Sequence, residues 1–219
     1  MNPIYRSVTA WVVVALMGSA SWAQSVSDTT LNAQLLIAAR QGDVAKVKYA
    51  LSQGASPDSR NRLGKTALVM AAEKGQVELA LSLIDAGCNV NLPSVEAVTP
   101  LMAASYVGNV EIVKALLQHG AKPDLVDHMH KPAMIYAAGQ GHTDVVRLLL
   151  DVGVDVNAAY ADQRLTALMW AAGQGHADTV KFLLAHGART DLQDDRGLTA
   201  KAIATSTGHA ELATLLDVH

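Results

Sequence analysis

Apolar and polar residues follow one another along the chain with the period of an α-helix, and the pattern is clearest in the segment 143–151. The apolar positions of that segment are Val145, Val146, Leu149 and Leu150. The polar positions, Asp144, Arg147 and Asp151, are three and four residues apart. Residues at this spacing share one face of a helix, so the pattern predicts a buried apolar stripe and a solvated opposite face.

Helices of this kind are predicted in pairs that repeat. The segment 66–87, TALVMAAEKGQVELALSLIDAG, predicts one helix over about 67–74 and a second over about 77–86. Thr66 is a suitable N-cap, and Gly75 and Gly87 are suitable helix ends. A glycine like Gly75 recurs at 42, 75, 108, 141, 175 and 208, at intervals of 33, 33, 33, 34 and 33 residues. This period predicts an all-α repeat solenoid of stacked helix-turn-helix units rather than a globular domain around one pocket.

Related segments begin TPLMAASYVGNVEIV at 99, KPAMIYAAGQGHTDVV at 131 and TALMWAAGQGHADTV at 166. These residues resemble the ankyrin repeat, whose pattern is roughly D-x-x-G-x-T-P-L-H-x-A-A-x-x-G-H-x-x-I-V-x-L-L-L-x-x-G-A. The resemblance runs from about Leu31 to the C-terminus. It implies antiparallel helix pairs joined by projecting β-hairpin loops and stacked into a curved solenoid. It also implies that protein partners bind the concave side, which the first helices and the hairpin tips line.

The chain departs from the family pattern at three kinds of position. The histidine that follows T-P-L is replaced by Val69, Met102, Ile135, Met169 and Ala202, so we expect apolar packing in place of its hydrogen bond to threonine. The fourth copy has Lys131-Pro132 in place of Thr-Pro, so its first helix is expected to lack a hydroxyl cap. The tip glycine is kept as Gly64 and Gly197, whereas Ala97, His130 and Arg164 replace it in the other tips.

The first residues predict a secretory signal peptide. Arg6 precedes an apolar run over 8–17, and small residues stand at Ser21 and Ala23, so cleavage is expected after Ala23. The run is shorter than the roughly 20 residues that span a bilayer, so no membrane insertion is expected after cleavage. We therefore expect the mature protein in the periplasm of a Gram-negative bacterium, as a monomer.

The predicted organisation has three parts. Residues 1–23 are the signal peptide, 24–30 a short disordered lead, and 31–219 an ankyrin-repeat domain. The six units of that domain are expected at about 31–60, 61–93, 94–126, 127–160, 161–193 and 194–219. The first and last units are the least regular, as expected of capping repeats.

Charge and cysteine content narrow the possible functions. The formal net charge of −3 disfavours nucleic-acid binding. Residues 31–75 hold seven Lys/Arg against three Asp/Glu, and residues 76–219 hold nine against sixteen, so the two ends differ in sign. This asymmetry either orients a partner or reflects drift of a solvated face. Cys88 is the only cysteine, so no intrachain disulfide can form, and we expect a buried structural thiol.

The histidines raise the question of a metal site. His142, His176 and His209 each follow a repeat glycine, where the ankyrin pattern also has histidine, so a structural role is expected for them. His119 and His186 each precede the second repeat glycine, which is also a common histidine position in the family. His219 is the last residue. What remains is the tip Asp127-His128-Met129-His130, where His128 and His130 are candidate metal ligands and a polar loop is the alternative. No nucleophile motif or phosphate-binding glycine loop is present, so we predict no enzyme activity, no catalytic residues and no cofactor.

We predict a non-enzymatic module that binds another protein through its concave face and hairpin tips. The expected partner-binding residues are Arg62, Tyr106, Met129, Tyr136, Tyr160, Arg164, Trp170 and Arg196. The alternative for Tyr136 and Trp170 is that they fill gaps between repeats. Gly139 and Gly173 are expected to leave low spots where a partner backbone can come close. The function considered first is an accessory to an envelope stress-defence enzyme. The alternatives are an immunity-type inhibitor of a toxin, a metal-binding protein that uses the tip at 127–130, and a structural spacer.

Overall fold

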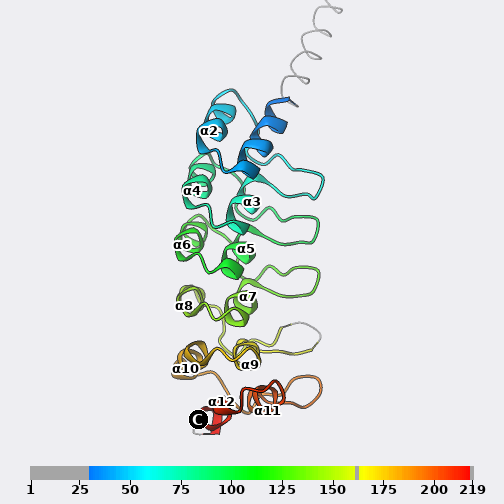
Figure 1. Ribbon diagram of the computed structural model, residues 1–219, viewed down its shortest axis with the longest axis vertical. Helices are drawn as coiled ribbons and strands as arrows, with labels where there is room; N and C mark the ends of the chain where they lie inside the picture. Colours follow the sequence, from blue (N-terminus) through cyan, green and yellow to red (C-terminus); the bar gives the residue numbers. More distant parts are fainter. Residues whose placement is uncertain (1–29, 161–162, 218–219) are drawn as a thin grey trace, which may run out of the picture.

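The protein is a stack of helix pairs (Figure 1). The computed structural model describes residues 30–160 and 163–217. Residues 30–41 form the first helix. The helices that follow are α2 (Val44–Ser52), α3 (Ala67–Glu73), α4 (Val77–Asp85), α5 (Pro100–Val107), α6 (Val110–Gln118), α7 (Ala133–Gly139), α8 (Thr143–Asp151), α9 (Ala167–Gly173), α10 (Ala177–Ala185), α11 (Ala200–Ser206) and α12 (Ala210–Asp217). The predicted all-α repeat solenoid is confirmed, and the predicted helices of the segment 66–87 end within one residue of α3 and α4.

The helices stand in two columns. In Figure 1 the second helices of the pairs (α2, α4, α6, α8 and α10) form the outer column, and the first helices (α3, α5, α7, α9 and α11) form the inner column. Long loops project from the inner column away from the outer one, and their far ends are the tips. The described parts of these loops hold isolated β-bridges, Arg60 with Thr66 and Tyr160 with Leu165, and no longer strand.

Small residues allow the inner helices to pack closely. Each inner helix packs on its neighbours in the inner column and on the second helix of its own repeat. The alanine pairs at these contacts are fully buried; they are Ala71 with Ala72, Ala137 with Ala138, and Ala171 with Ala172. On the outer column, Val145, Val146 and Leu149 are buried as predicted, whereas Leu150 is only partly buried. Burial of these apolar stripes against neighbouring repeats is what stabilises a stack without disulfides.

Two histidines join their repeats to the one before. Nε2 of His142 lies 3.0 Å from the carbonyl oxygen of Tyr106 and donates to it. A Cβ atom at Gly108 would lie 2.4 Å from the His142 ring, and Gly108 has φ +78°. Glycine is therefore required there by both space and backbone conformation. His176 repeats the arrangement, with Nε2 at 3.0 Å from the Gly139 carbonyl oxygen.

A second pair of histidines closes the outer helices. Nδ1 of His119 lies 2.8 Å from the carbonyl oxygen of Ala115, and Nδ1 of His186 lies 2.7 Å from that of Phe182. The Ala115 carbonyl also accepts the backbone N–H of His119, so the ring adds a second bond there. Both rings thus bring a side-chain donor to a carbonyl in the last turn of their helix. The structural interpretation of His119, His142, His176 and His186 is confirmed.

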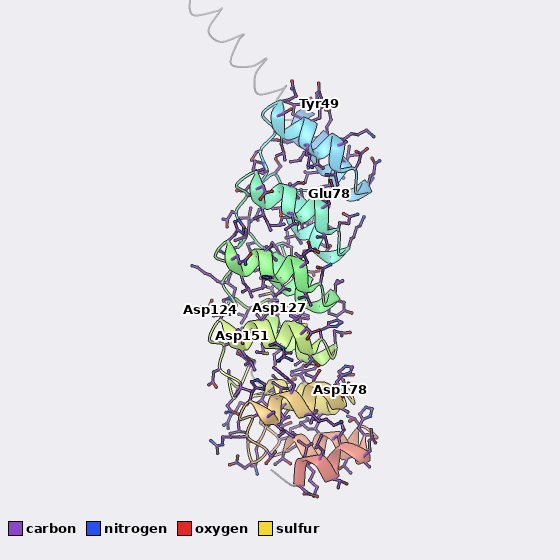
Figure 2. All side chains as sticks on the ribbon, turned by 90° about the vertical axis from the view of Figure 1, so that its left-hand side faces the viewer. Tyr49, Glu78, Asp124, Asp127, Asp151 and Asp178 are labelled. Carbon is purple, nitrogen blue, oxygen red and sulfur yellow. The ribbon has the colours of Figure 1, made fainter. Side chains whose placement is uncertain are left out.

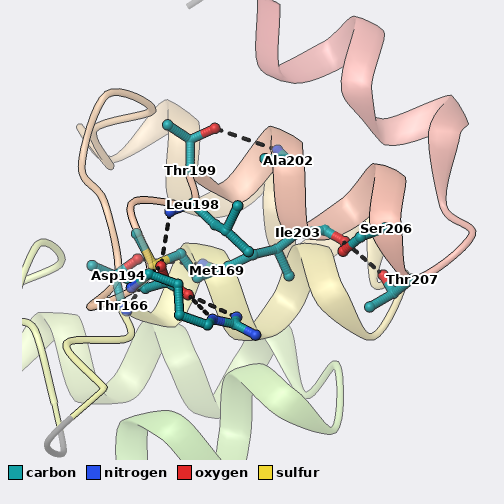
Figure 3. Close-up of polar contacts among 10 residues, drawn as sticks. Thr166, Met169, Asp194, Leu198, Thr199, Ala202, Ile203, Ser206 and Thr207 are labelled. Atoms are coloured by element: carbon teal, nitrogen blue, oxygen red, sulfur yellow. Dashed lines mark hydrogen bonds and ion pairs between the residues drawn. The ribbon is translucent and has the colours of Figure 1, made fainter.

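Threonine caps begin four of the five inner helices. The side chains of Thr66, Thr99, Thr166 and Thr199 each accept a hydrogen bond from the backbone N–H three residues ahead. Figure 3 shows the caps made by Thr166 and Thr199. Helix α7 is the exception, because its N-cap is Pro132 and no side-chain cap bond is present. The missing cap was predicted, but the alignment behind it was one residue out: Pro132 itself, not Lys131, occupies the threonine position.

Methionine sulfur replaces the family histidine in two repeats. The backbone N–H groups of Thr99 and Thr166 lie 3.5 Å from the sulfur atoms of Met102 and Met169. The expectation of purely apolar packing is therefore wrong for Met102 and Met169, since a thioether sulfur is a weak acceptor. Val69, Ile135 and Ala202 carry no side-chain acceptor, and there the expectation stands.

Two further expectations concern residues at the margins. The described chain begins at Thr30, which is already helical, so the first helix reaches at least one residue before the expected start of the repeats. The predicted signal peptide and most of the lead lie outside the described residues. Across 30–160 and 163–217, no helix is long and apolar enough to cross a membrane.

Candidate partner-binding groove

The residues predicted to bind a partner all come from the inner helices and the tips. Tyr106, Tyr136 and Trp170 lie on α5, α7 and α9. The tip residues are Arg62, Met129, Arg164 and Arg196, and Tyr160 stands at the base of the tip between α8 and α9. No predicted residue falls on the outer column, whose face is turned to the viewer in Figure 2 with Glu78, Asp151 and Asp178 along it.

Three of these residues form a row across consecutive repeats. The rings of Tyr106 and Tyr136 meet edge to face, with centroids 6.0 Å apart. The amino group of Lys131 lies 4.6 Å from the centre of the Trp170 ring, which is a cation–π contact. Tyr106 remains 52 % exposed, whereas Tyr136 and Trp170 are partly buried. Tyr136 and Trp170 thus do both things that were considered: they pack between repeats and still present a surface.

Three adjoining hollows follow this row, and we call them together the groove. The first, about 310 Å³, lies against α3 and α5 and is lined by Glu73, Val98, Tyr106 and Tyr136 among others. The second, about 180 Å³, shares Tyr106 and Tyr136 with the first. The third, about 390 Å³, shares Lys131, Ile135 and Trp170 with the second and reaches the tips through Met129 and Tyr160. Shared walls make the hollows one continuous surface over four repeats.

The glycines of the inner helices behave differently from one another. We expected both Gly139 and Gly173 to leave space for a partner. Gly139 lines the second hollow. A Cβ atom at Gly173 would meet Ile203 at 2.9 Å, so the space there is already filled by the next repeat. The prediction is wrong for Gly173.

Large apolar side chains are exposed at the tips. Leu63, Val95 and Met129 are 62 %, 63 % and 65 % exposed. A single exposed apolar residue needs no explanation, but these three stand on consecutive tips beside the groove. They extend its apolar surface outward along the tips.

The family follows from the sequence of the whole stack. Residues 16–94, 35–127, 82–160 and 134–217 match the family described as Ankyrin repeats (3 copies). The chain belongs to the ankyrin-repeat family. Ankyrin repeats are protein–protein interaction modules and are generally non-enzymatic. A comparison with curated proteins gives no match.

The buried carboxylate of Asp127 organises one ankyrin tip. One of its oxygens accepts hydrogen bonds from the backbone N–H groups of Met129 and Lys131, both at 2.8 Å. The other accepts the hydroxyl proton of Tyr136 at 2.5 Å. Burial, and then this hydrogen bond to the carboxylate, raise the pKa of Tyr136 above its usual range. Asp127 is only 6 % exposed, so its carboxylate holds the inside of the tip and is not presented to a partner.

This use of Asp127 bears on the metal hypothesis. Both of its oxygens already accept hydrogen bonds, so it is not placed to join His128 and His130 as a third ligand. Among the described residues, no group of three or more His, Cys, Asp or Glu side chains is arranged to hold a metal ion. Zinc sites take four protein ligands when structural and three when catalytic, whereas the tip offers two histidines.

The tips are hydrogen-bonded to one another along the ankyrin stack, which sequence reasoning missed. The backbone N–H of Val95 donates to the Leu63 carbonyl at 3.0 Å, and that of His128 donates to Glu96 at 3.2 Å. Asp195 donates in the same way to Gln163 at 3.0 Å. Tips held in this way lose little conformational freedom when a partner binds.

The tip between α8 and α9 is one residue longer than the others, which accounts for the single glycine interval of 34 residues. Arg164 is exposed and has φ +55°. Tyr160 exchanges two backbone hydrogen bonds with Leu165 and is half-buried. Burial first, and the nearby Asp155 second, raise the pKa of Tyr160. Tyr160 and Arg164 are thus both presented beside the third hollow, while residues 161–162 lie outside the described part.

Arg196, which we expected to bind a partner, forms an ion pair within its own tip. Nη2 of Arg196 lies 2.7 Å from the carboxylate of Asp194, whose other oxygen accepts N–H groups of the same tip. This ion pair occupies part of the Arg196 guanidinium.

Cys88 is buried as expected, and burial raises its thiol pKa to about 12, which disfavours the reactive thiolate.

Proposed function

We propose that this ankyrin-repeat protein is exported to the periplasm and binds a protein partner, without catalysis, through the groove and the neighbouring tips. The observation that carries the proposal is the groove itself: three adjoining hollows with Tyr106, Tyr136 and Trp170 in one row. Tyrosine, tryptophan and arginine dominate the binding energy of protein interfaces. They are gathered on the side that the ankyrin fold offers to partners.

The site of action is proposed from the sequence. The apolar run over 8–17 and the small residues Ser21 and Ala23 support export and cleavage after Ala23. In the periplasm, an accessory to an envelope stress-defence enzyme is the role that we put first. The partner's identity separates this role from inhibition of a toxin.

One experiment tests binding, location and processing together. The full chain is produced in its own host with a C-terminal affinity tag, and is captured separately from periplasmic and cytoplasmic fractions. Mass spectrometry of the captured protein then reads both its N-terminus and its partners. We expect an N-terminus at Gln24, recovery from the periplasm, and one partner in stoichiometric amount.

Matched variants identify the surface used. Tyr160→Ala with Arg164→Ala removes two groups beside the third hollow, whereas Tyr49→Ala with Lys114→Ala removes a tyrosine and a cation from exposed positions of α2 and α6. The partner should be lost from the first variant and kept by the second. A partner kept by the first and lost from the second would place binding on the outer column and overturn the proposal.

A further inference from the structure

The groove side of the molecule carries a different charge from the rest. Its described inner helices and tips (60–74, 93–107, 126–140, 159–160, 163–174 and 193–208) hold eight Lys/Arg against five Asp/Glu. The rest of 31–219, apart from 161–162, holds eight against thirteen. The groove side is therefore net +3, whereas that remainder is net −5. Two of the five carboxylates, Asp127 and Asp194, are only 6 % and 3 % exposed, so the exposed surface is more basic than the count indicates.

This positive charge is concentrated at one end of the groove. Residues 60–74 contain Arg60, Arg62, Lys65 and Lys74 against Glu73 alone. Nζ of Lys65 is paired with Glu73 at 2.7 Å, while Arg60 and Arg62 are exposed on the tip. An acidic stretch of a partner is the charge complement of this end. The aromatic hollows follow directly beyond it.

The spacing of the hollows selects a backbone conformation for the partner. The hollows succeed one another with the packed helices α5, α7 and α9, and axes of packed helices lie about 8–10 Å apart. A β-strand places side chains on the same face about 7 Å apart, which falls out of step with that spacing. A polyproline-II helix rises about 3.1 Å per residue with three residues per turn, so it repeats its face about every 9 Å. Aromatic-lined grooves are also the surfaces that such helices bind.

We infer that the groove binds an extended segment of the partner in the polyproline-II conformation. The segment has a large apolar side chain at every third residue, one for each hollow. It continues into acidic residues that lie over Arg60 and Arg62. This inference rests on the proposed function and specifies what the partner offers to the groove.

Trp170 provides a direct readout. The chain contains three tryptophans, and Trp11 and Trp22 precede the described residues. In the full chain with Trp11→Phe and Trp22→Phe, Trp170 is the only tryptophan, so its emission reports on the groove. The probe is a synthetic peptide of four glutamates followed by Leu-Pro-Pro three times. One control peptide groups the same leucines in a single run, and another replaces the glutamates by lysines.

The inference predicts saturable change of Trp170 emission with the first peptide, and at least about tenfold weaker binding of each control peptide. Tyr106→Ala should weaken binding by about tenfold, whereas Tyr49→Ala, a change of another exposed tyrosine on α2, should leave it unchanged. Both substituted tyrosines are exposed, at 52 % and 63 %, so loss of folding does not confuse the comparison.

Two results overturn the inference, and they differ in what they say of the proposed function. Equal binding of the grouped-leucine peptide, or no binding of any peptide, contradicts the polyproline-II segment. If the host partner is nevertheless captured and is lost on Tyr106→Ala, the proposed function stands without the inference. If no partner is captured from the host either, both fail.

Discussion

The hydroxyl of Tyr136 donates a 2.5 Å hydrogen bond to the buried carboxylate of Asp127. Tyr136 lies on an inner helix and Asp127 in the tip that precedes it, so the bond fixes the tip against the wall of the groove. The remaining carboxylate oxygen holds the tip backbone at Met129 and Lys131. One side chain thus links the shape of the tip to the position of an aromatic ring that we assign to binding.

Tyr136→Phe removes this bond while keeping the ring. Hydrogen bonds to charged groups contribute about 1.5–3 kcal/mol, and a buried carboxylate left without its partner is costly. We expect the free energy of unfolding, measured by urea denaturation, to fall by about that amount. Tyr49→Phe on exposed α2 is the control and should change it by less than about 0.5 kcal/mol. Equal effects of the two substitutions would show that the bond contributes nothing.

The same tyrosine gives the protein an alkaline weakness. The pKa of Tyr136 is raised in the folded state, mainly by burial and then by its bond to Asp127, relative to about 10 in the unfolded chain. Its stabilising contribution is therefore complete below about pH 10 and is lost as the pH rises through the folded-state pKa. Unfolding free energy measured from pH 9 upward should fall more steeply for the native chain than for Tyr136→Phe. Parallel curves would contradict the raised pKa.

Three tips store backbone strain. Ala97, His130 and Arg164 have φ of 61°, 57° and 55°, and they are the non-glycine residues with positive φ among 30–160 and 163–217. This conformation costs an L-residue about 1–2 kcal/mol, while glycine costs about 0.5–1 kcal/mol in unfolded-state entropy. Ala97→Gly should therefore stabilise the protein by about 0.5–1 kcal/mol.

Gly197→Ala is the reverse substitution at an equivalent tip. Gly197 has φ +76°, and the nearest atom to an added Cβ is 4.0 Å away, so strain rather than collision would be measured. It should destabilise by about the amount that Ala97→Gly stabilises. Thermal or urea denaturation of both variants tests the pair; changes of the same sign would refute the strain account.

Lys131 contributes through Trp170 and not through a helix cap. A threonine at 131 would stand one residue before the N-cap, so it would not replace the missing cap at Pro132. It would remove the 4.6 Å cation–π contact, worth about 0.5–1 kcal/mol at a partly exposed site. Lys131→Thr should thus lower stability. A double-mutant cycle with Trp170→Leu should give a coupling of about that size, whereas additive effects would leave the contact without energetic value.

Most of the fold could be predicted because the helix period and the glycine interval both appear as regular residue spacings in the sequence. The helix ends near Gly75 and Gly87, the burial of the alanine pairs and the structural role of His142 all follow from repeated spacing. The prediction aligned Pro132 with Pro100 because each is the proline before an apolar helix. Pro100 is the first residue of α5, whereas Pro132 is the N-cap of α7, one position earlier. A match to the repeat pattern does not distinguish the N-cap from the first helical residue, because that distinction depends on the backbone conformation.

The groove was harder to predict for a different reason. The aromatic row was expected, since tyrosine and tryptophan stand out on the inner helices. The sulfur acceptors of Met102 and Met169, the inward turn of Asp127 and the bonds between successive tips depend on side-chain orientation. Repeat spacing says where a residue lies along the stack but not which atom it offers. For the same reason Gly173 was expected to be open, although Ile203 covers it.

The most direct test of the central claim places a photo-crosslinking amino acid at Tyr106 in the groove or at Lys114 on the outer column, in the full chain in its own host. Both positions are exposed, so both variants should fold. We predict that irradiation links one protein to position 106 and none to position 114. Linkage from position 114 with none from position 106 would contradict the assignment of partner binding to the groove.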